Sequence, residues 1–201
     1  MSVLLALLAC GMLGGDGPMR GEAALRVELE GSGPTAATDG PILVTRLEKL
    51  GATATSTAPS PDRISLAITQ IRDGQALQLA IRPNRLEVAF PDGQTLTSAD
   101  IASAEAAPDE MTGQPRVNAT FTDAGGRRFC ELTRAAVGKP IPIRVDGVEL
   151  SAPIVREPIC GGRMSVMMGG ASTNAMDEAH ALAVALGTPV LGSDWILAVI
   201  E

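Results

Sequence analysis

The sequence has little of several residue types on which common binding sites depend. Aromatic residues make up 2% of the 201 residues, and tyrosine is absent. Single-stranded nucleic acid is usually held by stacking on aromatic side chains, and a net charge of −7 repels its phosphate backbone. Nucleic acid is therefore excluded as an expected partner. With 45% hydrophobic residues, aliphatic side chains and methionine must fill the core.

The residues of a catalytic or metal centre are also scarce. His180 is the single histidine, and it stands among alanines in a predicted helix, with no G-x-S-x-G motif elsewhere. Cys130 and Cys160 are far apart and lack the C-x-x-C or H-x₃-H spacing of a metal site. The numerous acidic residues form no recognisable catalytic pair and are expected on the solvated surface. We expect no enzyme activity, no cofactor, no metal and no small-molecule substrate.

Residues 1–22 are predicted to be a leader and a tether. The apolar run at residues 3–9 (VLLALLA) is shorter than the roughly 20 residues that cross a bilayer, but it suits the hydrophobic region of a secretory signal. With Cys10 it resembles a bacterial lipobox, in which cleavage leaves Cys10 acylated at the new N-terminus. The alternative is a remnant of a longer signal, or an anchor without a lipid. Both interpretations predict an exported, periplasmic protein that meets the membrane only through its N-terminus.

The other two cysteines allow two interpretations. An oxidising periplasm permits a disulfide between Cys130 and Cys160. Alternatively, both are small buried hydrophobic residues, and we favour this second interpretation.

The first third of the chain has the pattern of a small sheet with one helix. Residues 24–29 alternate apolar and polar side chains, as in a half-buried strand. Residues 42–50 place leucines on one helix face, with Asp39 in the N-cap region and Gly51 after the end. Strands at 52–57 and 63–71 would follow, giving a β-α-β-β order that is typical of a split α+β sandwich.

The rest of the chain predicts a second group of strands and helices. Asp146-Gly147 between two apolar runs is a strong hairpin signal. Residues 91–116 are expected to be mostly loop, with one helical turn near 98–104. The helix at 123–137 would be capped by Asp123 and bury Phe129, Leu132, Ala136 and Val137, and the helix at 175–186 would be capped by Asn174. The predicted strands are 76–82, 85–90, 116–122, 141–145, 148–154, 163–168 and 195–200.

A methionine-rich strand is the one feature that suggests a binding surface. It contains Met164, Val166, Met167 and Met168 between two glycine pairs. Flexible thioethers suit the recognition of varied apolar segments. The alternative, which we favour, is that these side chains fill a core that has few aromatic residues.

Motifs at fixed spacings occur between residues 117 and 186. They are Phe129, Glu131, Leu132 and Thr133, then VGKP at 137–140, DG at 146–147, SAP at 151–153, EPI at 157–159, GG at 161–162 and DEA at 177–179. This series resembles the head of the first periplasmic domain of the SecD/SecDF protein-export subunit. More faintly, RVELE at 26–30 and the segment from residue 44 to 68 resemble the base of that domain.

The resemblance implies an α+β fold in which a head at 74–188 is inserted into a base at 23–73, which a strand within 189–201 completes. It also implies a non-enzymatic module that binds translocating or unfolded polypeptide, or the Sec machinery, through an exposed edge strand or the methionine-rich strand. The sequence has no membrane helices like those of the family, and a proton relay needs ionisable groups within the bilayer. The alternative is therefore an envelope structural protein that uses the same scaffold for one dedicated partner.

Overall fold

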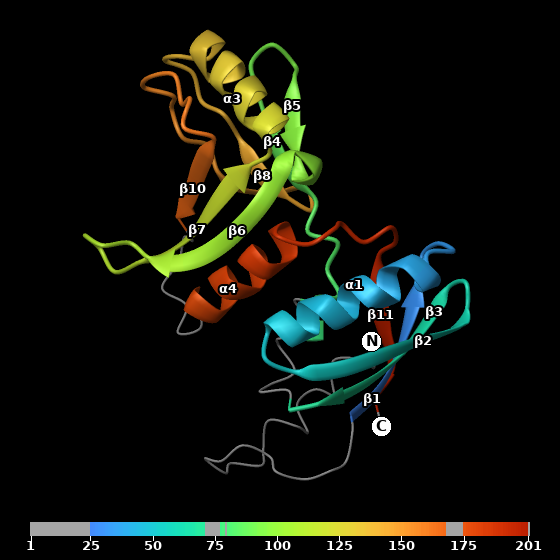
Figure 1. Cartoon of the computed structure of the whole chain (residues 1–201). Coiled ribbons are helices and arrows are strands. Elements are labelled where there is room, and N and C mark those ends of the chain that lie inside the picture. Colours follow the sequence, from blue (N-terminus) through green and yellow to red (C-terminus); the bar gives the residue numbers. More distant parts are fainter. Residues whose placement is uncertain (1–24, 71–76, 79, 168–174, 201) are drawn as a thin grey trace. The chain divides into compact units, whose positions relative to one another are not determined.

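The chain forms two compact units, which we call the base and the head (Figure 1). The computed structural model describes residues 25–70, 77–78, 80–167 and 175–200. The base comprises the chain up to Pro83 and from Leu191 onward, and the head is Asn84–Val190. The predicted α+β class is confirmed. The first boundary lies several residues beyond 74, because Leu77 and Ile81 are buried in the core of the base.

The base is a four-stranded antiparallel sheet in the order β11-β1-β3-β2, with helix α1 packed on one face. Its core consists of alternate apolar residues of β1 and β3 and the leucines of α1, as the sequence pattern predicted. The strand at 195–200 pairs with β1, so the predicted return to the base is confirmed. The elements are β1 (Leu25–Gly31), α1 (Ala36–Lys49), β2 (Thr53–Ser60), β3 (Arg63–Thr69) and β11 (Trp195–Ile200).

A buried carboxylate ties the chain that returns from the head to helix α1. Asp39 is 1% exposed. Its carboxylate accepts hydrogen bonds from Thr35 Oγ1 at 2.6 Å, Trp195 Nε1 at 2.8 Å, and the backbone nitrogens of Gly192 and Ser193 at 2.9 and 3.1 Å. Burial by itself raises the pKa of Asp39, but these hydrogen bonds together hold it below the ordinary value of 3.8. The predicted N-cap role for Asp39 was wrong: α1 begins earlier, and Asp39 lies within its first turn.

A buried guanidinium on the same helix holds the chain that enters the head. Arg46 is fully buried, and its Nη1 donates to the carbonyl oxygens of Ala80 at 3.0 Å and Arg82 at 2.6 Å. Asp39 and Arg46 are seven residues apart, which places them on one face of α1. Helix α1 therefore fixes both segments between which the head is inserted.

The head contains two antiparallel sheets, in the orders β10-β7-β6 and β5-β4-β8-β9, with helices α3 and α4. All three phenylalanines of the chain lie in its core, with the ring of Phe129 centred 4.6 Å from Phe121 and 6.3 Å from Phe90. The elements are β4 (Leu86–Ala89), β5 (Thr95–Thr97), the 3₁₀ turn η2 (Ser98–Asp100), β6 (Ile101–Pro108), β7 (Pro115–Phe121), α3 (Asp123–Ala135), β8 (Ile143–Val145), β9 (Val148–Ser151), β10 (Arg163–Met167) and α4 (Ala175–Leu186).

Close packing of α4 on the sheet explains a strand that the sequence pattern did not reveal. Residues 91–116 were expected to be mostly loop, but they include β5 and β6, and the helical turn is limited to η2. Strand β6 is rich in Ala, which forms strands poorly in isolation. Its small side chains let α4 approach: a Cβ added to Gly187 would lie 3.4 Å from the backbone nitrogen of Ala104.

Other local predictions have mixed outcomes. The hairpin at Asp146-Gly147 is confirmed, with φ values of 50° and 79° in the left-handed region that a tight turn needs. The strand predicted at 76–82 was wrong, because its described residues 77, 78 and 80 are helical.

The ends of the predicted helices also differ in detail. Helix α3 is capped by Thr122, whose Oγ1 accepts a hydrogen bond from Gly125 N, rather than by Asp123. Val137, expected in the buried stripe, is 46% exposed, and the predicted cap Asn174 lies outside the described residues.

Replacing Asp39 by asparagine is expected to lower the free energy of unfolding at pH 7 by about 2 kcal/mol, because an amide cannot accept all the buried donors. The folded-state pKa of Asp39 lies below the unfolded value. Its contribution is therefore complete above the unfolded pKa and is lost as the pH falls through the folded pKa. Urea unfolding at pH 7, 5 and 3 should show the difference between wild type and Asp39→Asn shrinking at the lowest pH. Glu48→Gln changes an exposed carboxylate on the same helix and is the control. A difference in free energy of unfolding between wild type and Asp39→Asn that stays the same at all three pH values would contradict the lowered pKa of Asp39.

Candidate polypeptide-binding surface

The methionine-rich strand contributes mainly to the core of the head. Met164 and Val166 are 8% and 5% exposed and pair with Ala119 and Val117 of β7. Alternation along β10 turns both side chains inward, so these two residues fill the core, as the favoured interpretation had it, and their interpretation as a binding surface is corrected. Met167, on the opposite face, is 39% exposed. Met168 and Cys10 lie outside the described residues.

Strand β11 presents a different apolar surface, at an edge of the base sheet. It pairs with β1 alone within the described chain, so its other side has no strand partner there. Ile196, Val199 and Ile200 are 63%, 47% and 38% exposed. Backbone groups on an open edge, together with exposed apolar side chains, favour pairing with another extended chain.

A bulge in β11 places two of these side chains on one face of the sheet. Ile196 pairs with Glu30 and Val199 pairs with Glu28, with a register shift between the two pairs. The extra residue of the bulge compensates for the odd spacing between Ile196 and Val199. Both therefore lie on the same side as the two glutamates, opposite the face that α1 covers.

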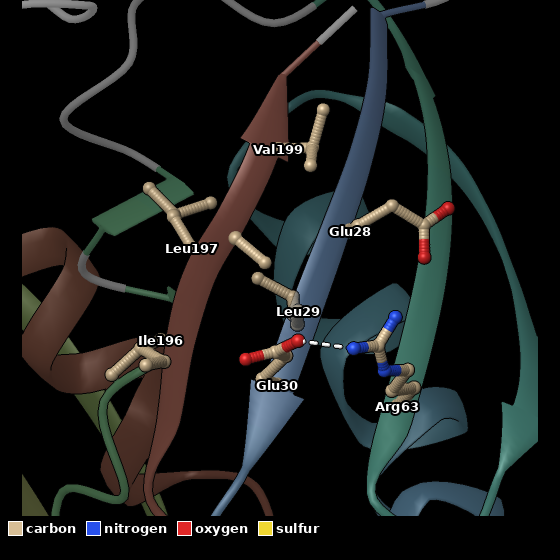
Figure 2. A pocket seen from close by; sticks show the side chains of 8 residues that line it. Glu28, Leu29, Glu30, Arg63, Ile196, Leu197 and Val199 are labelled. Atoms are coloured by element: carbon tan, nitrogen blue, oxygen red, sulfur yellow. Dashed lines mark hydrogen bonds and ion pairs between the residues drawn. The ribbon is translucent and has the colours of Figure 1, made fainter. Parts of the chain in front are cut away.

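The polar side of this surface comes from β1 and β3. A shallow hollow is lined by residues of β1, β3 and β11 (Figure 2). Glu30 forms an ion pair with Arg63, and both side chains are about half exposed. Glu28 has no ion-pair partner among the described residues. We call Glu28, Glu30, Arg63, Ile196 and Val199 the β11 surface.

The other edge of the base sheet differs from β11. Strand β2 has the sequence TATSTAPS, and its outward side chains include Thr55 and Thr57. Pro59 also lies in this edge and cannot donate a backbone hydrogen bond. Polar side chains and proline are typical of an edge protected against pairing. Of the two edges of the base, β11 is thus the one suited to an additional strand.

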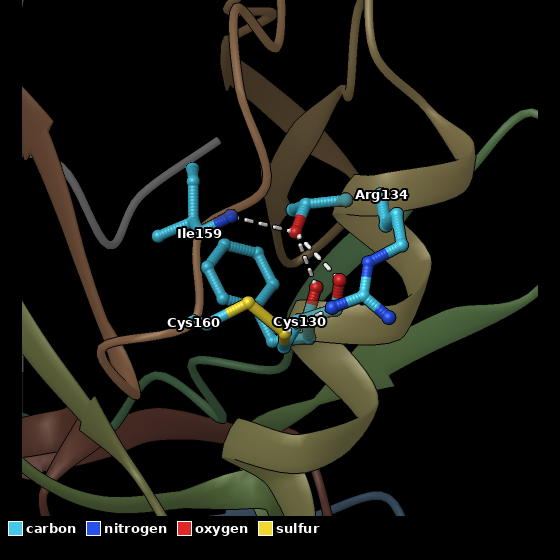
Figure 3. Close-up of a disulfide and its surroundings, with 6 residues drawn as sticks. Cys130, Arg134, Ile159 and Cys160 are labelled. Carbon is cyan, nitrogen blue, oxygen red and sulfur yellow. Dashed lines mark hydrogen bonds between the residues drawn. A yellow bond between two sulfur atoms is a disulfide. The ribbon is translucent and has the colours of Figure 1, made fainter.

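A disulfide joins Cys130 of α3 to Cys160 in the loop before β10, with Cα atoms 4.4 Å apart (Figure 3). The favoured prediction of two buried thiols was wrong: Cys160 is exposed and Cys130 is partly buried. Ile159 N donates to Thr133 Oγ1 at 3.0 Å, which holds the loop against α3 beside the sulfur atoms. The sequence left this pairing open because the contact between loop and helix is tertiary.

The described residues contain neither a cluster of metal ligands nor a membrane-spanning helix. No group of three or more His, Cys, Asp or Glu side chains is arranged there to hold a metal ion. No helix in that part of the chain is long and apolar enough to span a membrane. His180 is exposed on α4.

A base with an inserted α+β head defines a known class of domain. The family model described as "SecDF, P1 head subdomain" matches residues 75–191, more than half of the chain. The chain therefore belongs to the SecDF P1 head family.

Two curated relatives are translocase subunits. Protein translocase subunit SecDF of Thermus thermophilus is 40% identical over 91 residues, which cover 45% of this chain and 12% of the relative. Protein translocase subunit SecD of Acidaminococcus fermentans is 36% identical over 107 residues, which cover 52% of this chain and 25% of the relative. The matches thus span a quarter or less of the relatives' length.

Two solved SecDF structures align with most of this chain. One, described as "Structure and function of a membrane component SecDF that enhances protein export", aligns with a TM-score of 0.70 at 25% identity and covers 88% of this chain and 99% of that one. A crystal structure of SecDF in a super-membrane-facing form gives a TM-score of 0.72 at 25% identity, covering 88% of this chain and 30% of that one. The likeness extends over both units.

Loss of the disulfide is expected to lower the free energy of unfolding by about 3–4 kcal/mol, because the bond closes a loop of 30 residues in the unfolded chain. Urea unfolding of wild type with and without a phosphine reductant measures this difference. The double variant Cys130→Ser/Cys160→Ser is the control, since reductant should leave its unfolding midpoint unchanged. A wild-type midpoint that does not respond to complete reduction would contradict the prediction.

Proposed function

We propose that this chain is an exported protein-export module that holds extended segments of translocating or unfolded polypeptide on its β11 surface. Its membership of the SecDF P1 head family supports a role in export. The similar SecDF structure is described as that of a membrane component that enhances protein export. In this proposal the module works on the periplasmic side of the membrane, where residues 1–22 tether it.

The open edge of β11 is the observation that carries the proposal. An added strand would bond to the backbone of β11, and backbone bonds do not depend on the side chains of the bound segment. Ile196 and Val199 would contact apolar side chains on one face of that segment. Export substrates vary in sequence, so recognition through the backbone suits them.

The charges beside the edge favour a particular kind of segment. Glu28 and Glu30 flank the apolar side chains, with only Arg63 to offset them within the β11 surface. A segment that alternates apolar and basic residues would therefore complement this surface best.

Weak affinity for an added strand suits the transient binding of a translocating polypeptide. A backbone hydrogen bond contributes only about 1 kcal/mol net, and association of an isolated segment has an entropic cost of its own. A short added strand therefore binds weakly. Such a contact releases its segment readily, as a polypeptide in transit requires.

Adding charge to the edge is expected to weaken polypeptide binding about tenfold, equivalent to about 1.4 kcal/mol. The variant Ile196→Lys/Val199→Lys removes the apolar contacts and places solvated charges beside the open backbone. Thr55→Lys/Thr57→Lys makes the same charge change at the opposite edge and should bind like wild type. Fluorescence anisotropy with several unrelated, permanently unfolded polypeptides provides the measurement. Equal loss in both variants, or in neither, would contradict the assignment of β11.

Photo-crosslinking identifies the partner in the cell. A photoreactive amino acid at residue 199 of the full-length protein, in its native membranes, should capture many exported chains or translocon subunits. Mass spectrometry of the same sample reports the N-terminus and any acyl group on Cys10. Capture of one unrelated envelope protein would instead support the dedicated-partner alternative. An unprocessed N-terminus in the cytosolic fraction would overturn the proposed location.

A further inference from the structure

We propose that the Cys130–Cys160 disulfide is a thiol–disulfide exchange site, at which a thiolate from outside the chain attacks the sulfur of Cys160 and Cys130 is the leaving group. This inference does not depend on the proposed polypeptide-binding function. It rests on differences between the surroundings of the two sulfur atoms.

Cys160 is the more accessible partner. It is exposed in the loop before β10, whereas Cys130 is partly buried on α3. Gly161 and Gly162 follow Cys160, and a Cβ added to either glycine would meet no atom within 4 Å. Open space and the lack of side chains on the C-terminal side of Cys160 leave room for an incoming thiolate.

Cys130 is the partner whose negative charge the protein stabilises. Arg134 lies one turn further along α3, and its Nη2 is 3.8 Å from the Cys130 sulfur (Figure 3). A neighbouring guanidinium favours the thiolate form of cysteine, and a better-stabilised thiolate leaves faster. Within the described chain, no cationic side chain bonds to the Cys160 sulfur. The asymmetry therefore directs attack to Cys160.

The exchange is balanced in two steps. In the first, the thiolate forms a bond to the Cys160 sulfur, the Cys130–Cys160 bond breaks, and Cys130 leaves with the electron pair and later takes a proton from water. In the second, another thiolate attacks the outer sulfur of the mixed disulfide and releases Cys160 as a thiolate. Two thiols are oxidised to one disulfide, and the two cysteines are reduced. The reverse sequence, with an external disulfide as oxidant, restores the bond.

The loop has contacts that keep the reduced cysteines close. On one side of Cys160, Ile159 N donates to Thr133 Oγ1 at 3.0 Å. On the other side, Phe121 N donates to the carbonyl oxygen of Gly162 at 2.9 Å. Both contacts are independent of the sulfur atoms. A loop held at both sides keeps the effective concentration of the two thiols high, so the bond can form again.

Peptide mapping of a trapped intermediate tests the direction of attack. The full-length oxidised protein is mixed with excess reduced glutathione, quenched with acid at short times, and treated with N-ethylmaleimide. Glutathione is expected on Cys160 and maleimide on Cys130. Glutathione mainly on Cys130, an even distribution, or no reaction while the protein remains folded would overturn the proposal.

Two matched variants test the role of Arg134. Arg134→Gln is expected to slow the initial reaction with glutathione about threefold, because the Cys130 thiolate loses its stabilising charge. Arg127→Gln removes a charge from the same helix at an exposed position and should react at the wild-type rate. Circular dichroism checks that both variants are folded. Equal rates for Arg134→Gln and wild type, or equal slowing in both variants, would overturn the assignment of Cys130 as the leaving group.

Discussion

The hydrogen bonds to the buried carboxylate of Asp39 are the contacts on which the rest of the base depends. Strand β11 is separated from the remainder of its sheet by the whole head, so the chain must close a long loop before β11 can pair with β1. Loop closure has an entropic cost that contacts at the end of the loop must offset. The Asp39 carboxylate accepts hydrogen bonds from Gly192 and Ser193, immediately before β11, and from Trp195 within it. These bonds place the strand where its register can form.

Arg46 gives the same helix a matching role at the other junction. It holds the carbonyl oxygens of residues 80 and 82, just before the head begins. A buried guanidinium is costly unless its donors are satisfied, and here backbone oxygens satisfy them. Burial of the Asp39 carboxylate is costly for the same reason, and hydrogen-bond donors satisfy its oxygens. The two buried charged residues thus anchor the two junctions at which the chain leaves the base for the head and returns to it.

The sequence predicted the segments whose secondary structure depends on local residues better than those whose secondary structure depends on distant contacts. Helix α4 and strand β11 have the predicted bounds, because their own residues mark them: Gly187 and Pro189 end the helix, and the strand is a short apolar run. Residues 76–82 (ALQLAIR) also alternate, but packing of Leu77 and Ile81 in the base favours a helical turn. Strand β6 was missed because its stability comes from neighbouring elements rather than from its own four alanines.

The same distinction applies to the candidate site. The methionine pattern left a binding surface and core filling open, with core filling favoured. Alternation along β10 turns Met164 inward, and the pairing with β7 reveals which side is buried. An edge strand was expected to bind polypeptide, but an apolar strand can lie at the centre or the edge of a sheet. The order of strands in the base, which is a tertiary property, identifies β11 as an edge. The disulfide likewise depends on a loop meeting a helix.

The anchoring of both junctions by α1 has a consequence for how such domains evolve. A host domain that secures its own two attachment points tolerates wide changes in what is inserted between them. Heads of different size, loop length or surface chemistry could be exchanged in one ancestral base without redesign of its core. Because Asp39 and Arg46 each anchor one junction within the base, a change in the head leaves the contacts that hold these junctions in place.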